Sequence, residues 1–146
     1  MSISFVSEGV ARPKLSYKKV SNWLKQIVGK FGGVSGNLTY IFCSDKYLID
    51  INYRYLGHDY YTDIITFNYN EGKLISGDVF ISIDRVVENS VLFKVSLKEE
   101  LLRVIVHGLL HLLGLKDGND MEKDYMRRIE NECIFLFNNN CNEYII

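Results

Sequence analysis

The chain has 146 residues, 47% of them hydrophobic, which is enough for one domain with a real core, expected to span residues 1–146. Its formal charge of −1 at pH 7 excludes recognition of nucleic acid through overall charge alone. The sequence has neither a signal-peptide pattern nor a charge-free apolar run of membrane-spanning length, so we expect a cytoplasmic protein without a membrane partner. Cys43, Cys133 and Cys141 have unrelated spacings and fit reduced thiols.

The first 44 residues predict two strands around a helix. Residues 3–6 form a short candidate strand, and residues 37–43 alternate and are rich in aromatic and β-branched side chains. Between them, Gly32 and Gly33 end a helical pattern that begins near residue 16. Its apolar stripe comprises Val20, Trp23, Leu24, Ile27, Val28 and Phe31.

This predicted helix lies in a stretch of uncompensated positive charge. Residues 9–44 contain no acidic side chain, and four lysines project away from the apolar stripe: Lys18, Lys19, Lys25 and Lys30. Such lysines usually form a solvated helix face, but they can also contact the phosphate backbone of RNA. The residues alone leave both interpretations open.

A second helix is predicted over residues 45–56, with Ser44 as its N-cap and Gly57 as its end. Its inward face is expected to comprise Leu48, Ile51 and Tyr55. Arg54 follows Asp50 by four residues, and a surface ion pair is the simplest interpretation of that spacing. His58 is isolated on the next connection and is expected at the surface.

The second half of the chain predicts a strand pair and three helices. Residues 64–69 and 78–83 alternate, with turn chemistry at 70–72, which indicates a hairpin or neighbouring strands. A helix is expected over residues 84–93. Ser96 and Glu99 then form a capping box that opens an apolar helix, expected to be central because it has almost no polar face after Arg103. A last helix, from about residue 119, is predicted to bury Tyr125, Met126, Ile129, Cys133 and Leu136, and residues 138–146 are ambiguous.

Two of the three histidines, His107 and His111, lie four residues apart on the apolar helix, so both rings can converge on one ion. Gly114 can end this helix in a left-handed conformation and turn the chain back, bringing Asp117 to the same ion. The pattern H-x-x-x-H-x-x-G-x-x-D has the spacing of the zincin-type H-E-x-x-H-x-x-G-x-x-H site. Gly108 stands in place of the catalytic glutamate, which argues against a peptidase. Hydrogen-bonded core histidines are the alternative, but the combined offsets favour a metal site.

The predicted elements define an α+β fold class. Four strands would form a small mixed sheet flanked by helices, and the zincin-like metal site would lie where the central helix ends. Several acidic residues fall between residues 117 and 132, whereas basic residues dominate residues 9–44, so charge is polarised along the sequence.

Three segments also match family motifs. Residues 51–55 (INYRY) look like L-N-x-x-[FY]-R, and residues 61–67 (YTDIITF) with 77–82 (GDVFIS) look like T-D-V-L-S-F and G-D-I-x-I-S. Residues 107–117 look like H-G-x-L-H-L-x-G-[YF]-D-H. Together with residues 126–130, they cover most of the chain from about residue 45 onward, in matching order and spacing. The chain therefore resembles the YbeY family of bacterial ribosomal RNA maturation factors.

The resemblance implies a metal-dependent, single-strand-specific endoribonuclease that acts in 3′-end maturation of small-subunit ribosomal RNA and in ribosome quality control. Its implied partners are ribosomal RNA and the small ribosomal subunit with its proteins. It implies one divalent metal, with zinc as the expectation, held by His107, His111 and Asp117. Asp117 stands where the family's usual third histidine aligns, and its harder, negatively charged oxygen leaves the identity of the metal more open.

The resemblance also assigns roles to cationic residues. Arg54 is matched to the family's arginine, a bidentate phosphate ligand, and Arg54 and His107 are the predicted catalytic residues. Arg54 and the four lysines, Lys18, Lys19, Lys25 and Lys30, are the predicted RNA contacts. Two alternatives are a zinc hydrolase of another substrate class and a non-catalytic RNA or ribosome assembly factor with a structural metal.

Overall fold

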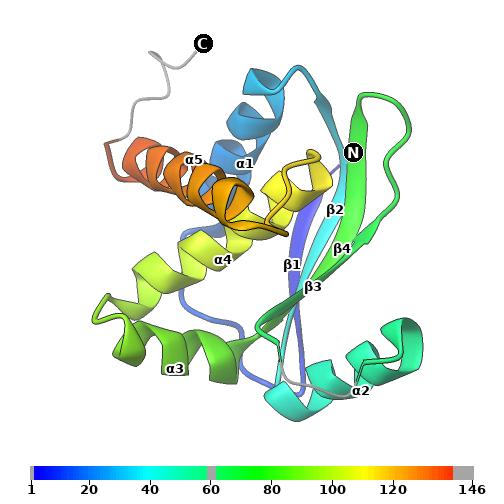
Figure 1. Cartoon of the computed structure of the whole chain (residues 1–146), viewed down its shortest axis with the longest axis vertical. Helices are drawn as coiled ribbons and strands as arrows, with labels where there is room; N and C mark the ends of the chain where they lie inside the picture. Colours follow the sequence, from blue (N-terminus) through cyan, green and yellow to red (C-terminus); the bar gives the residue numbers. More distant parts are fainter. Residues whose placement is uncertain (1, 59–61, 140–146) are drawn as a thin grey trace.

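The computed structural model describes residues 2–58 and 62–139. Within them, the elements in chain order are β1 (Ile3–Glu8), α1 (Tyr17–Lys30), β2 (Val34–Cys43), α2 (Asp45–Leu56), β3 (Ile64–Asn68), β4 (Leu74–Ser82), α3 (Ile83–Leu92), α4 (Leu97–Leu112) and α5 (Asp120–Asn139). The strands form one mixed sheet with helices packed against it (Figure 1). The predicted α+β class with a small four-stranded sheet is confirmed.

The sheet has the strand order β1-β2-β4-β3. β1 pairs with β2 and β2 with β4 in parallel, whereas β3 runs antiparallel to β4. The last pair confirms the predicted hairpin. The two parallel pairs require crossover connections, which contain α1 in one case and α2 with β3 in the other.

The two faces of the sheet bury different side chains, as the alternation of a strand requires. On one face, residues of β2 and β4 pack with α1, α4 and α5 into the main core, which includes Leu38, Tyr40, Phe42, Val79 and Ile81. On the other face, α2 covers a smaller cluster of Cys43, Leu48 and Ile65. Figure 1 shows α1, α4 and α5 on one side of the sheet and α2 apart from them.

α4 is the central helix, as predicted. Its apolar residues are buried along nearly its whole length, and its backbone is tied to the sheet by the Tyr40 hydroxyl, which donates to the Ile105 carbonyl at 3.0 Å. α5 is anchored in turn by the Trp23 indole, which donates to the Cys133 carbonyl at 2.8 Å. These buried hydrogen bonds fix the position of both helices relative to the sheet and α1.

Several boundaries differ from the prediction. β2 begins at Val34 and β4 at Leu74, earlier than expected, because these starts pair with each other despite the glycines around them. Position 77 of β4 requires glycine, because a Cβ there would lie 2.5 Å from the Phe67 carbonyl oxygen. Residue 83 opens α3 rather than ending the strand.

Burial also corrects three predicted core residues. Tyr55, Tyr125 and Phe31 are exposed, by 65%, 45% and 41%, and Phe31 is the C-cap that follows α1 rather than part of the helix. His58 is exposed, as predicted. Cys43 and Cys133 are buried free thiols, whereas Cys141, the connection at 59–61 and the tail from residue 140 lie outside the described residues. No helix in the described residues is long and apolar enough to cross a membrane.

Candidate metal centre

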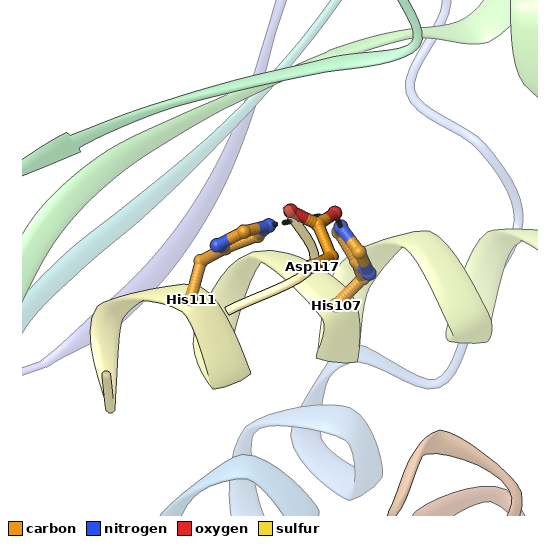
Figure 2. Close-up of side chains that lie close together, drawn as sticks. All are labelled: His107, His111 and Asp117. Atoms are coloured by element: carbon orange, nitrogen blue, oxygen red, sulfur yellow. Dashed lines mark hydrogen bonds and ion pairs between the residues drawn. The ribbon is translucent and has the colours of Figure 1, made fainter. Parts of the chain in front are cut away.

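The site is built on the last turns of α4. The Ser96 side chain accepts a hydrogen bond from the Glu99 backbone N–H at 3.0 Å, so the predicted N-cap starts the helix in the correct register. One helical turn apart, the rings of His107 and His111 emerge on the same face, with centroids 4.6 Å apart and planes at 78° (Figure 2). Both side chains are partly exposed, which leaves their ring nitrogens accessible.

The turn after α4 delivers the third residue. Gly114 adopts φ +99°, a left-handed conformation that favours glycine, and its N–H donates to the His111 carbonyl. The Leu115 N–H then donates to the Leu110 carbonyl, and the Leu115 side chain packs against the main core. The chain therefore folds back over the helix and places Asp117 above both rings, as Figure 2 shows.

Both distances from Asp117 to the histidine nitrogens match the ligand spacing of a tetrahedral zinc site. Oδ2 of Asp117 lies 3.5 Å from Nε2 of His107 and 3.3 Å from Nε2 of His111, and all three ligand atoms lie within 4.8 Å of one another. Ligands about 2.1 Å from a zinc ion and about 109° apart are separated by about 3.4 Å. The two nitrogen atoms and one oxygen atom present therefore fit a metal ion without moving the backbone.

A buried network behind His107 was missed by the sequence analysis. Nδ1 of His107 lies 2.6 Å from Oε2 of Glu130, which is 4% exposed, and Nη1 of Arg103 donates to Oε1 of the same carboxylate at 3.0 Å. Nη2 of Arg103 also donates to the Asn131 side chain at 2.8 Å. Glu130 lies four residues after buried Met126 and three before Cys133. An acidic residue at that spacing on an apolar stripe was the available signal.

The network also sets the electrostatics of His107. Burial lowers the pKa of its imidazole, but the hydrogen bond and charge of Glu130, together with the charges of Asp117 and Asp63, raise it above the ordinary histidine value. The pKa of Asp63 is itself raised, chiefly by burial, against the opposing effects of His107 and a backbone hydrogen bond. Three carboxylates thus surround one imidazole, an arrangement that favours a cation.

A cavity of about 340 Å³ opens beside His107 and Asp117. It is bordered by α3, α4 and α5, and its lining is rich in charged side chains: Asp63, Glu100, Arg103, Lys123, Arg127 and Glu130. Phe93 and Asn89 line it as well. The cavity lining therefore combines four carboxylates (Asp63, Glu100, Asp117 and Glu130) with three cationic side chains (Arg103, Lys123 and Arg127), of which Arg103 is paired with Glu130.

The other predicted site residues lie elsewhere. Arg54 is 67% exposed and forms an ion pair with Asp50, 3.1 Å apart, as the simplest interpretation of their spacing predicted. It does not line the cavity beside His107. When Tyr55 is placed in register with the family motif, the motif's arginine falls at Leu56, so Arg54 lies two positions too early. A catalytic role for Arg54 stays a prediction that this geometry does not favour.

The four lysines lie on α1, away from the cavity of His107. Lys18 and Lys19 border a small cavity with Trp23 and Phe137, and the Lys19 ammonium lies 4.4 Å above the Phe137 ring. Lys25 and Lys30 are exposed. Their predicted contacts with RNA therefore stay predictions about a separate surface.

Fold and site together define a class: a mixed α+β protein whose central helix and following turn present a His-His-Asp cluster that could hold a metal ion. Residues 7–138 match the family model described as Endoribonuclease YbeY. The chain belongs to this family, and membership supports an endoribonuclease role and RNA as the substrate.

Relatives and a solved structure agree. A protein named Endoribonuclease YbeY from Parabacteroides distasonis is 43% identical, covering 97% of this chain and 99% of that protein. Another with the same name from Phocaeicola vulgatus is 46% identical, over 92% and 97% of the two chains. The solution structure of TM1509 from Thermotoga maritima has a TM-score of 0.64 and 26% identity, covering 97% of this chain and 95% of that one.

Proposed function

We propose that the protein is a metal-dependent, single-strand-specific endoribonuclease that matures the 3′ end of small-subunit ribosomal RNA and acts in ribosome quality control. Its partners would be ribosomal RNA and the small ribosomal subunit with its proteins, in the cytoplasm. The observation that carries the proposal is the convergence of His107, His111 and Asp117, with ligand atoms within 4.8 Å of one another, in a chain of an endoribonuclease family.

We propose zinc as the resident metal, held by Nε2 of both histidines and by Oδ2 of Asp117. When bound, a divalent metal would supply Lewis-acid stabilisation of the negative charge that develops on the phosphate as the phosphodiester breaks. Because Asp117 contributes a charged oxygen rather than an imidazole nitrogen, the site would hold manganese or magnesium better, relative to zinc, than a site of three histidines.

The side chains around the cavity would bind and orient the RNA. Arg127 and Lys123 line the cavity that contains His107, so they can contact phosphates on either side of the scissile bond. Arg103 is already held by Glu130 and Asn131, which makes it better suited to fixing the site than to binding substrate. A preformed cavity of this kind would position the RNA backbone without reading base sequence.

Two observations weigh against the alternative functions. A peptidase of the zincin type needs a glutamate after the first histidine, but at Gly108 even a Cβ would lie 2.8 Å from Val79. A structural zinc site is normally closed by four protein ligands, whereas three potential ligands converge in the described part of the chain. These three are 22%, 29% and 40% exposed, which leaves room for a substrate oxygen.

The test begins with metal content per chain, measured by mass spectrometry on the untagged protein. Wild type should carry about one zinc, Asp117→Ala should lose most of it, and Asp124→Ala should match wild type because Asp124 is exposed and outside the cluster. The same three proteins are then assayed on single-stranded and double-stranded RNA. Cleavage should require both the metal and a single strand.

Maturation is tested separately in cells that depend on this protein. Asp117→Ala should leave small-subunit RNA with an unprocessed 3′ end, whereas Asp124→Ala should restore normal ends. If wild type binds zinc and folds normally but cuts no RNA, the assembly-factor alternative would be favoured. Arg54→Ala belongs in the same panel, and unchanged cleavage would leave Arg54 with its surface ion pair alone.

A further inference from the structure

The buried carboxylate of Glu130 bridges two partly buried side chains, one at each of its oxygens. Its Oε1 accepts from Nη1 of Arg103, and its Oε2 lies 2.6 Å from Nδ1 of His107. Glu130 is 4% exposed and sits on α5, whereas both partners sit on α4. The pair Arg103–Glu130 thus holds one edge of the His107 ring between two helices.

An ionised carboxylate can only accept hydrogen bonds, so Nδ1 of a neutral His107 must carry the proton. Its other nitrogen, Nε2, is then the one with a free lone pair, and this atom faces Oδ2 of Asp117 at 3.5 Å. Histidines that bind metals commonly donate their second ring nitrogen to a carboxylate in this way, which fixes the tautomer and raises the basicity of the ligand atom.

We propose that Glu130 is a positioning residue that selects the Nδ1-protonated tautomer of His107 and thereby keeps Nε2 ready for the metal, with Arg103 holding the carboxylate in place. The proposal rests on the metal site proposed above, but the tautomer of His107 can be measured without any metal. His111 is not part of this network: its contact with Asp117 is made through Nε2.

Glu130→Gln gives a sharp test because the side chain keeps its shape. Arg103 has only donors, so the amide oxygen of the new glutamine must face Arg103. The amide NH₂ then faces Nδ1 of His107, which has to accept. The ring is forced into the Nε2-protonated tautomer, and its ligand atom is blocked by a proton.

Long-range ¹H–¹⁵N NMR of the metal-free protein, at a pH where the imidazole is neutral, reports which ring nitrogen of His107 carries the proton. We expect Nδ1–H in wild type and Nε2–H in Glu130→Gln. Competition with a fluorescent chelator should give a zinc Kd about 10–100-fold weaker for Glu130→Gln than for wild type. Glu132→Gln is the matched control, because Glu132 lies on the same helix but is exposed, and it should behave as wild type in both measurements.

Rescue separates positioning from a general loss of structure. In the double variant Arg103→Met with Glu130→Gln, no guanidinium donates to the amide oxygen of the new glutamine. That oxygen can then turn toward His107 and accept a hydrogen bond from Nδ1–H. The tautomer should return to Nδ1–H, and zinc affinity should recover at least in part. The double variant also removes a buried ion pair as a unit, which proteins often tolerate, so it serves as the folded test if Glu130→Gln alone fails to fold.

The outcomes distinguish the two proposals. A folded Glu130→Gln that keeps the Nδ1–H tautomer and binds zinc within about twofold of wild type would overturn the role of Glu130. So would a double variant that folds but shows the Nε2–H tautomer. If wild type has the Nδ1–H tautomer and binds no zinc, the metal-dependent function fails while the tautomer selection by Glu130 stands.

Discussion

Replacing Gly108 with alanine tests how closely α4 is seated on the sheet. A Cβ at this position would lie 2.8 Å from Cγ1 of Val79 and 2.9 Å from Cδ1 of Ile64, closer than carbon atoms can approach. The end of the Ile64 side chain can rotate away, but Val79 is fully buried on β4 and has nowhere to move. The helix or the strand must therefore shift.

The magnitude follows from two opposing effects. Overpacking of a well-packed interior destabilises by about 1–3 kcal/mol, whereas alanine in place of glycine within a helix stabilises by about 1 kcal/mol. Gly29→Ala is the matched control: Gly29 lies in α1, and nothing is within 4 Å of a Cβ built there. The helical effect is common to both variants, so Gly108→Ala should be less stable than Gly29→Ala by about 1–3 kcal/mol.

Urea unfolding followed by tryptophan fluorescence measures this difference. Trp23 is the single tryptophan, is 3% exposed and packs against Phe137, so its emission reports loss of the core. Equal free energies of unfolding for Gly108→Ala and Gly29→Ala would refute the close approach of α4 to the sheet.

Three further predictions concern charge and thiol chemistry. Burial is the main cause that raises the pKa of Glu100, so the folded state binds its proton more tightly than the unfolded state and stability falls as pH rises. Glu100→Gln should therefore melt higher than wild type at about pH 8, with the difference vanishing near about pH 4. Lys18→Glu should flatten the salt dependence of RNA binding by about 0.7 in log–log slope if Lys18 contacts a phosphate, and an unchanged slope would indicate a solvated face. Burial raises the pKa of the Cys43 and Cys133 thiols to about 12, so peptide mass spectrometry should find both resistant to iodoacetamide until the protein unfolds.

The parts of the site that lie on α4 and the turn after it were predictable from the sequence. The spacing of His107 and His111, the left-handed residue at Gly114 and the return of Asp117 all follow from the geometry of one helix and its C-terminal turn. The N-cap at Ser96 fixed where the helix begins. Each of these features is local, so no knowledge of tertiary packing was needed.

Residues brought to the site by tertiary packing were not predicted. Glu130 is 23 residues from His107 in the sequence and meets it only because α5 packs across α4. Asp63 reaches the cavity from the segment before β3. Arg54 was predicted instead because it was matched to the family's phosphate-binding arginine, but α2 packs on the other face of the sheet from α4.

The prediction for α5 was right in part. Met126 and Cys133 are buried as predicted, and Ile129 and Leu136 pack partly buried against the core, whereas Tyr125 is exposed. The buried stripe of the helix also includes Glu130 and Phe137, which were not predicted. An acidic residue in the middle of the true stripe hides it from any search for apolar periodicity. Arg103 and His107 determine which face of α5 is buried, because they give the Glu130 carboxylate hydrogen-bonding partners inside the protein.

The polar residues that interrupt the apolar pattern of α4 fall on one line. Glu100, Arg103, His107 and His111 are separated by three, four and four residues, which is the spacing of a single helical stripe. The first three line the same cavity, and Glu130 joins them from α5. If these four positions served only to pack the core, leucine or valine would be expected there, as on the other faces of α4. The polar residues that break the apolar pattern of α4 therefore mark the candidate site, because charged side chains stay buried only where a ligand or a partner charge compensates them.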